Sequence, residues 1–421
     1  MKKMTQRLAF LLAAAVLFTL TACSGGEEEQ TEDDDTSSTS TSSSILPEDF
    51  EVDTSIEDLC MATAGVSSDY VMFTVDGIDV TAGHFLYWLA YDIATWEYYY
   101  YYYYGLDLDL SADSELTAAL IEDARNAAAL TVLTVYRTQE LGYTLSDEAQ
   151  QELDDSIAAT IDSYGGEEAF QETLRTLGLD EDLYYLLTAS AYYYDLLEEE
   201  MYSGHPTEEE VRTYIEEEDL LYAKHILILT VDSDYQPLDE EELAERQALA
   251  EDILTQLQNS EDLEADFDAL MNEYSEDTGL ASYPDGYLFT AGVMVSEFEE
   301  ATRALEFGEV SGLVEHVGED GESYSGYHII LRLDPADSEE VTENWLYDQM
   351  ETLLYGWRDD GEYVFSDAYN DLDVELFYAK FSAYQEAFEA LSEETEDETT
   401  SDDASTSDDA GSTSDDSETD S

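Results

Sequence analysis

The chain of 421 residues carries 104 Asp and Glu against 13 Lys and Arg, a formal net charge of −91. Three of the basic residues stand within the first seven positions, which leaves ten for the rest of the chain. No nucleic acid is expected as a partner, because neutralising phosphates requires clustered Lys and Arg. The acidity favours solubility and a weak attraction to basic, unfolded chains, although it is equally expected if the whole proteome of the source is acidic.

The N-terminus has the pattern of an export signal. Basic residues precede an apolar run over residues 8–20, and small residues follow it. Leu-Thr-Ala-Cys at 20–23 resembles the bacterial lipobox, which implies cleavage before Cys23 and lipidation of this residue. An ordinary signal peptide with an incidental cysteine is the alternative. We expect a signal peptide at 1–22 and a chain anchored by lipid on the extracytoplasmic face of the cell membrane, without a transmembrane helix.

Both ends of the mature chain are predicted to be disordered. Residues 23–45 and 392–421 consist mainly of Glu, Asp, Ser and Thr, which bury too little apolar surface to offset the entropy of ordering. Roughly 350 residues lie between them, enough for two or three domains. Cys60 is the only cysteine left after the lipidated one, so the mature chain forms no intramolecular disulfide.

Residues 46–219 are predicted to form a mainly helical domain. A hairpin at 70–80 alternates apolar residues around an Asp-Gly turn, and helical apolar spacing continues to about residue 203. Seven consecutive tyrosines occupy positions 98–104. They form either an aromatic surface for apolar segments of other proteins or a helix whose inner tyrosines pack and whose outer ones are merely exposed. We favour the second interpretation.

Six motifs occur in a fixed order between residues 221 and 334. They are the strand His-Ile-Leu-Ile (225–228), a helix (240–258), a helix with its following loop (267–277), a helix (292–298), a turn (308–314) and a closing strand (325–331). In this order and spacing they resemble the parvulin family of peptidyl-prolyl isomerases. The resemblance implies a small α+β domain at 220–335, in which helices wrap a four-stranded antiparallel sheet.

The chemistry of such a domain needs no nucleophile, since rotation about an X-Pro bond breaks no covalent bond. A barrier of about 20 kcal/mol separates the isomers, and a site that binds the twisted amide better than either planar form accelerates exchange. The site must combine a dry apolar seat for the proline ring with a stiff polar network. No cofactor and no metal is predicted. A calcium-like loop that begins at Asp107 lacks the required glycine at its sixth position.

The resemblance assigns both parts of the site to residues of this chain. The polar network would consist of His225, Asp277, Ser325 and His328. The proline seat would consist of Met294 and Phe298, closed by Leu288 or Phe289. A neutral histidine both donates and accepts, so two of them can fix each other's tautomers. The histidines and the apolar residues could instead be ordinary core, and Asp277 a turn residue.

The sequence departs from the family pattern at two places. Family members usually have a Gly-Gly-Asp-Leu-Gly-like turn where residues 282–289 read Ser-Tyr-Pro-Asp-Gly-Tyr-Leu-Phe. The basic cluster of phosphate-reading parvulins is also missing, and acidic residues follow the first strand instead, namely Asp232, Asp234, Asp239, Glu240 and Glu241. Phosphorylated substrates would therefore be repelled, and we expect a preference for unphosphorylated X-Pro bonds.

Two amphipathic helices are predicted in residues 336–391, which we expect to pack back on the domain at 46–219. The fold class is then α+β, with a discontinuous, mainly helical chaperone domain and an inserted parvulin domain. This architecture is similar to PrsA-type foldase lipoproteins and their SurA-like relatives. It implies a prolyl isomerase and chaperone whose partners are unfolded or partly folded secreted proteins with X-Pro bonds.

Two other functions compete with this interpretation. A non-enzymatic holdase would keep the parvulin domain as an inactive spacer or binding surface, and the displaced glycine of the turn at 282–289 supports this alternative. A solute-binding lipoprotein would need strands and helices that alternate over most of the chain, which the helical half does not supply.

Overall fold

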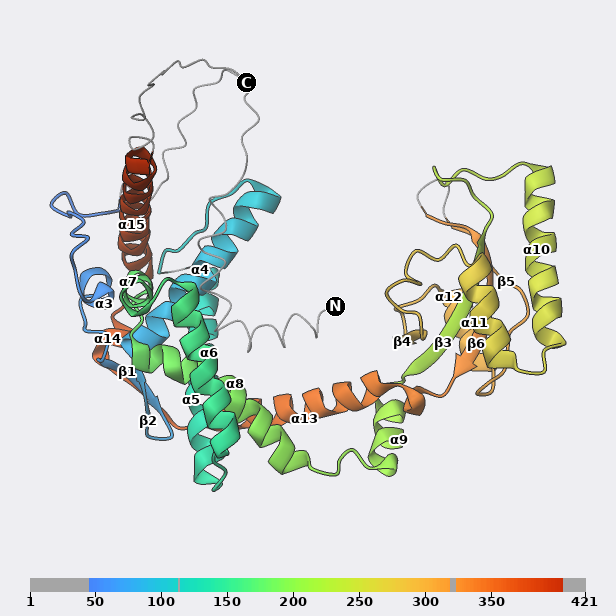
Figure 1. Cartoon of the computed structure of the whole chain (residues 1–421), viewed down its shortest axis with the longest axis horizontal. Helices are drawn as coiled ribbons and strands as arrows, with labels where there is room; N and C mark the ends of the chain where they lie inside the picture. The colour runs from blue at the N-terminus through green and yellow to red at the C-terminus, as the bar shows by residue number, and fades with distance from the viewer. Residues whose placement is uncertain (1–44, 113, 319–322, 404–421) are drawn as a thin grey trace, which may run out of the picture. The chain divides into compact units, whose positions relative to one another are not determined.

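The computed structural model describes residues 45–112, 114–318 and 323–403, with side chains up to residue 392 (Figure 1). The predicted signal peptide, the predicted lipidation site Cys23 and most of the two predicted disordered tails lie outside the described residues. The chain divides into two compact units. Unit 1 contains the residues up to Glu200 and those from Leu353, and unit 2 contains Met201–Thr352.

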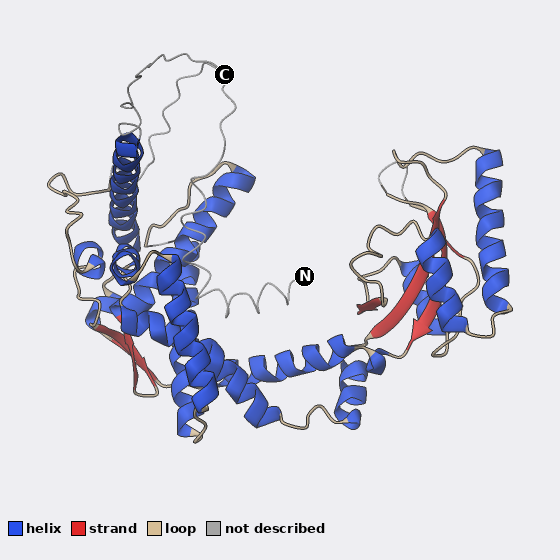
Figure 2. Cartoon of the chain, in the orientation of Figure 1, coloured by secondary structure: helices blue, strands red, loops and turns tan. Residues whose placement is uncertain are grey.

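Unit 1 is helical apart from one small sheet (Figure 2). Its elements before unit 2 are α3 (Leu59–Thr63), β1 (Val71–Val75), β2 (Ile78–Thr81), α4 (Ala82–Tyr104), α5 (Glu115–Glu140), α6 (Asp147–Ser163), α7 (Glu167–Leu177) and α8 (Glu181–Tyr202). Those after it are β7 (Tyr363–Phe365), α14 (Asp367–Asn370) and α15 (Val374–Asp403). The sheet has the antiparallel order β2-β1-β7, so a strand from the C-terminal part completes a sheet that begins near residue 70.

The hairpin of β1 and β2 ties the two parts of unit 1 together. Its turn residues Asp76 and Gly77 have φ angles of 51° and 81°, as expected for an Asp-Gly turn between twisted strands. The Asp76 carboxylate accepts a 2.9 Å hydrogen bond from the backbone N–H of Glu362 and pairs with Arg137 of α5 at 2.5 Å. Farther along, Tyr384 and Phe388 of α15 pack in one cluster with Leu59 of α3.

Unit 2 is built on a four-stranded antiparallel sheet with the order β4-β3-β6-β5. Its elements are α9 (Glu208–Glu217), β3 (Leu221–Leu229), α10 (Glu240–Gln258), α11 (Leu263–Tyr274), β4 (Tyr287–Phe289), α12 (Ser296–Ala304), β5 (Val314–His316), β6 (Gly326–Leu333), a 3₁₀ turn (Pro335–Asp337) and the first part of α13 (Glu339–Asp359). This sheet and its helices confirm the predicted fold class, in which a small α+β domain interrupts a discontinuous helical one.

The two faces of the sheet pack against different helices because side chains alternate along each strand. Ile226 and Ile228 point to a core formed with α10 and α11, in which Phe267 is fully buried. Leu221 and Ala223 point to the opposite face, where α12 packs. The second face carries the candidate site, because His225 continues the same alternation. None of the described helices combines the length and apolarity that crossing a bilayer requires.

The core between the sheet and α11 should dominate the stability of unit 2. Phe267→Ala removes a ring that has no exposed surface, and we expect it to lower the free energy of unfolding by about 3–5 kcal/mol. Phe307→Ala is the matched control, since 51% of this side chain is exposed, and it should cost less than about 1 kcal/mol. Urea denaturation of the full chain measures both, and equal losses would contradict this assignment of the core.

Candidate active site

A pair of histidines lies at the centre of the candidate site. In the ladder between β3 and β6, His225 pairs with Ile330 and His328 pairs with Leu227, so the two histidines are diagonal neighbours on one face. Their Nδ1 atoms are 3.0 Å apart, and both side chains are buried. The strand register alone therefore brings together two imidazoles that are 103 residues apart in the sequence.

Three further side chains complete a continuous hydrogen-bonded chain around the pair. Asp277 Oδ2 lies 3.1 Å from His225 Nε2 and accepts a 2.5 Å hydrogen bond from the Tyr287 hydroxyl. At the other end, the Tyr324 hydroxyl lies 3.3 Å from His328 Nε2.

The hydrogen-bond partners are compatible with the following proton positions. If His225 donates from Nε2 to Asp277, its Nδ1 is an acceptor when the ring is neutral. His328 must then donate from Nδ1, and its Nε2 accepts from the Tyr324 hydroxyl. Every polar atom of the two rings has a partner in this arrangement.

The electrostatics of the site agree with this protonation. Burial, reinforced by the neighbouring His225, lowers the pKa of His328 to about 3. Burial also opposes ionisation of Asp277, but hydrogen bonds from His225, Tyr287 and the backbone N–H of Gly279 outweigh it and lower the pKa of this carboxyl to about 2. At neutral pH the site thus holds a neutral His328 beside an ionised Asp277.

An apolar surface lies against the histidine pair. Phe298 of α12 is 2% exposed, and its ring stands nearly perpendicular to both imidazoles, with centroids 5.2 Å from His225 and 5.4 Å from His328. Phe289 of β4 lies 5.8 Å from Phe298, and Met294 packs against the same cluster while remaining partly exposed. The structure therefore places an apolar cluster directly beside a stiff polar network, and Met294 is the partly exposed member of the three.

Two residues expected from the sequence are not brought into the site. Leu288 points away from Phe289 because strand residues alternate, and it packs with Tyr214, Val341 and Trp345 instead. The Ser325 hydroxyl accepts a 2.8 Å hydrogen bond from the backbone N–H of Gly318 and makes no hydrogen bond to either histidine. The other predicted residues, His225, Asp277, Phe289, Met294, Phe298 and His328, lie together.

Tyr287 and Tyr324 are the site residues that sequence reasoning missed. Tyr287 stands two positions before Phe289 in β4, so it faces the same side of the sheet. Strand alternation predicts the position of Tyr287 once β4 has been located in the sequence. The position of Tyr324 cannot be predicted in this way, because Tyr324 lies in the loop before β6 and reaches His328 only through the fold of that loop.

The unusual turn before β4 has glycines at two positions where a side chain would collide with neighbouring atoms. Gly286 has a φ of 112°, and a Cβ atom there would lie 2.9 Å from the carbonyl oxygen of Ala223 in β3. A side chain on Gly279 would collide with the Tyr287 hydroxyl, so this glycine leaves the path from Tyr287 to Asp277 open. The displaced glycine of the sequence therefore permits close approach of the turn to β3.

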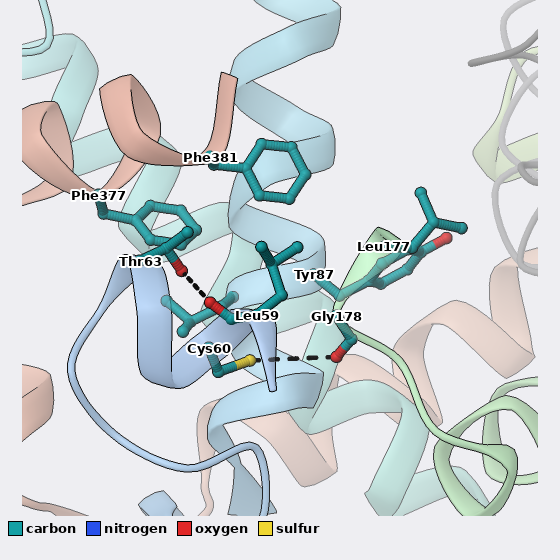
Figure 3. A pocket seen from close by; sticks show the side chains of 9 residues that line it. Leu59, Cys60, Thr63, Tyr87, Leu177, Gly178, Phe377 and Phe381 are labelled. Carbon is teal, nitrogen blue, oxygen red and sulfur yellow. Dashed lines mark hydrogen bonds between the residues drawn. The ribbon is translucent and has the colours of Figure 1, made fainter. Parts of the chain in front are cut away.

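A small cavity in unit 1 differs from this site. Figure 3 shows a cavity in unit 1 lined by Cys60, Tyr87 and Phe377 among others, but its volume of about 10 Å³ has room for at most about one water molecule. Burial raises the pKa of the Cys60 thiol to about 12, so this cysteine is unreactive at neutral pH. Among the described residues, no three His, Cys, Asp or Glu side chains gather in a metal-binding arrangement.

Comparison with known proteins places the site in a recognised domain. Residues 225–334 match the family described as the PPIC-type PPIASE domain, or rotamase. The chain is 31% identical over 226 residues to the foldase protein PrsA of Oceanobacillus iheyensis, covering 52% of this chain and 64% of that protein. It is 39% identical over 109 residues to PrsA of Halalkalibacterium halodurans, covering 26% and 29% respectively. The chain thus covers less than two thirds of either relative.

Solved structures of the same kind of protein are also similar. The crystal structure of foldase protein PrsA from Streptococcus pneumoniae has 17% sequence identity and a TM-score of 0.26, and the match covers 64% of this chain and 98% of that one. PrsA from Bacillus cereus has 20% identity and a TM-score of 0.26, with 66% and 96% covered. By the family match alone, residues 225–334 are a PPIC-type, or parvulin-type, peptidyl-prolyl isomerase domain, and by sequence identity the chain around them is similar to PrsA foldases.

Proposed function

We propose that this protein is a peptidyl-prolyl cis–trans isomerase and chaperone that assists the folding of secreted proteins. The observation that carries the proposal is the contact of Phe298 with both members of the His225–His328 pair. An apolar seat and a fully hydrogen-bonded polar network are the two parts that stabilisation of a twisted X-Pro amide requires.

The mechanism follows from the loss of amide resonance on twisting. The proline ring sits on the apolar surface of Met294, Phe298 and Phe289, which excludes water from one side of the bond. The twisted carbonyl carries less charge than the planar one, so it loses less by leaving water. The histidine pair, held by Asp277 and Tyr287, keeps fixed dipoles beside the bond that need no rearrangement during rotation. Neither histidine acts as a nucleophile.

The charges of unit 2 favour unphosphorylated substrates. Its arginines and its lysine are occupied, in the pairs Arg212–Asp334, Lys224–Asp268, Arg246–Glu276 and Arg303–Asp219 and in the stacking of Arg332 on Phe307. Asp277 and Glu297 are the negative charges that act on His328. A phosphate next to the proline would meet carboxylates and no free cation, which supports a preference for unphosphorylated X-Pro bonds.

The location of the protein is part of the same proposal. The export signal and the lipobox at Cys23 support a chain anchored by lipid on the extracytoplasmic face of the cell membrane. Its partners there would be unfolded or partly folded secreted proteins.

The apolar seat can be tested with matched phenylalanine variants. Phe298→Ala removes an apolar contact worth about 1.5–3 kcal/mol, so kcat/KM for an unphosphorylated X-Pro peptide should fall about tenfold to a hundredfold. Phe307→Ala, in the same domain but 51% exposed, should keep wild-type turnover. Circular dichroism establishes that both variants are folded.

Tyr287→Phe tests the polar network separately, because it keeps the ring and removes only the hydroxyl that donates to Asp277. The loss of one hydrogen bond of about 1 kcal/mol to a charged group should reduce turnover about fivefold or more. Wild-type turnover in both folded variants, Phe298→Ala and Tyr287→Phe, would reject this site. A folded wild-type chain without any turnover would leave the non-enzymatic holdase.

The protonation of His328 gives a pH prediction. Its pKa is about 3 in the folded chain and about 6.5 when unfolded, so unfolding takes up a proton between these values. Stability from this group is complete above pH 6.5 and decreases as the pH falls toward 3, by about 1.4 kcal/mol per unit. His328→Gln should remove this dependence, so urea denaturation should show a smaller loss from pH 6.5 to 5 than in the wild type. An equal loss, or a His328 resonance titrating near pH 6.5, would contradict a neutral His328.

The lipid anchor is tested by Cys23→Ser in a bacterial host that processes lipoproteins. The wild-type chain should remain in the membrane fraction after a high-salt wash, because acyl chains and not surface charges hold it there. The variant should lose the acyl modification, and mass spectrometry of the N-terminal peptide checks this directly. An unmodified Cys23 in the membrane-bound wild-type chain would rule out the proposed anchor.

A further inference from the structure

The C-terminal end of α4 presents an unusual aromatic surface. Six of the seven consecutive tyrosines are exposed, with Tyr101 and Tyr102 the most open at 70% and 67%. Trp96, one turn earlier, is also exposed. The helix ends at Gly105, which has a φ of 62° in the left-handed region. We call residues 98–104 the tyrosine end of α4.

No side of this helix end is covered by the described residues. Successive helical residues point about 100° apart, so four exposed side chains in a row, those of residues 101–104, cover the whole circumference. Only Tyr100 is partly buried. The interpretation that inner tyrosines pack into the protein is therefore wrong. In Figure 1 the last turns of α4 extend away from α5, α6 and α8.

The tyrosines support one another along the helix. Rings four residues apart lie close, with centroid distances of 5.9 Å for Tyr98–Tyr102, 4.6 Å for Tyr99–Tyr103 and 5.6 Å for Tyr100–Tyr104. Pairs at this spacing stabilise a helix and restrict the rings. The result is a preordered set of aromatic faces open to solvent.

Within the described residues, no cation is found beside these faces. No Lys or Arg occurs in the sequence between Arg7 and Arg125, whereas Asp107 and Asp109 follow within five residues of the last tyrosine. The ten basic residues from position 125 onward have partners elsewhere. Besides the five in unit 2, Arg125, Arg137, Arg175 and Arg358 pair with carboxylates, and Lys380 lies over Phe50.

We propose that the tyrosine end of α4 binds Arg- and Lys-bearing segments of unfolded polypeptide. A guanidinium or ammonium group is attracted to the face of an aromatic ring, and Arg also stacks on it. Neighbouring carboxylates strengthen the attraction for the same charge. Tyrosine offers this surface with little loss of side-chain entropy. The identity of the bound segment, an unfolded polypeptide, rests on the proposed foldase function, whereas the attraction between its cations and the tyrosine rings does not.

A membrane surface fits these observations less well. Tyrosine and tryptophan do gather at membrane interfaces, but membrane-binding helices carry Lys and Arg on their polar side. Here the adjoining charged residues are Glu97, Asp107 and Asp109, and the chain as a whole has a net charge of −91. Anionic lipid would repel such a surface.

The test uses the full chain and fluorescent peptides of one length that differ only in one repeated residue. In each peptide the repeated residue, which is Arg, Glu or Leu, alternates with Gly-Ser. Fluorescence anisotropy measures the affinity of each peptide for the chain. One variant replaces Tyr98, Tyr101, Tyr102 and Tyr103 by Leu, which keeps apolar surface and helix propensity but removes the four most exposed aromatic faces. The matched variant replaces the same four by Phe, which keeps the faces and removes the hydroxyls.

The Arg peptide should bind the wild type and the Phe variant alike, and the Leu variant about tenfold more weakly. Binding of the Arg peptide that the Leu variant retains in full would overturn the proposal, because acidic residues alone would then explain it. Equal binding of the Leu peptide, no binding of the Arg peptide, or stronger binding to vesicles of zwitterionic or anionic lipid would overturn it as well.

Failure of this proposal is distinguishable from failure of the proposed isomerase. Isomerisation of a short X-Pro peptide should be unchanged in the Leu variant, since its four substitutions lie outside the isomerase domain. Conversely, Phe298→Ala should lose turnover while it keeps full affinity for the Arg peptide. A Phe298→Ala chain that loses the Arg peptide too would show that the peptide binds at the isomerase site and would overturn the proposal for α4.

Discussion

The 3.0 Å contact between His225 and His328 is the interaction on which the rest of the site depends. It exists because β3 and β6 are adjacent and because their register sets the two histidines diagonally on one face. A slip of one residue would turn one ring to the opposite face, toward α10 and α11. Asp277 and Tyr324 hold the outer nitrogens, so the pair is fixed in position. Phe298 then packs against two rings that are held in place.

The small number of cations is the second constraint on this molecule. With ten Lys and Arg after the seventh residue, almost every one is used at a position where it joins distant segments. Arg137 holds the β1–β2 hairpin to α5, and Arg303 of α12 pairs with Asp219, two residues before β3. Exposed ion pairs contribute about 0–1 kcal/mol each, so the fold depends mainly on its apolar cores. The pairs matter more because they use the cations of the described residues. The other carboxylates and the exposed aromatic rings on the surface then have few cations beside them.

Much of the fold and part of the site could be predicted from the sequence. Apolar periodicity located the helices, and the order of six motifs located the isomerase domain. His225, Asp277, Met294 and Phe298 lie together as expected. The side of the sheet that Leu288 faces could not be predicted, because a shift of one residue in a three-residue strand turns every side chain to the opposite face. The displaced glycine of the turn also made the register of this strand uncertain. Ser325 and Tyr324 are adjacent in a loop, where no periodicity tells which side chain points to His328. The tyrosine run was misjudged because composition does not show whether another element covers a helix.

The isomerase site and the tyrosine end of α4 would recognise different features of one unfolded chain. The first needs a proline ring in a dry apolar seat, and the second needs positive charges. A flexible polypeptide that is held at one point samples the volume around that point, so its prolines meet the isomerase site at a raised effective concentration. This gain depends on the length and flexibility of the bound chain and not on any fixed arrangement of the two units. An exposed aromatic helix end can therefore contribute to isomerisation of long substrates without touching the bond that rotates.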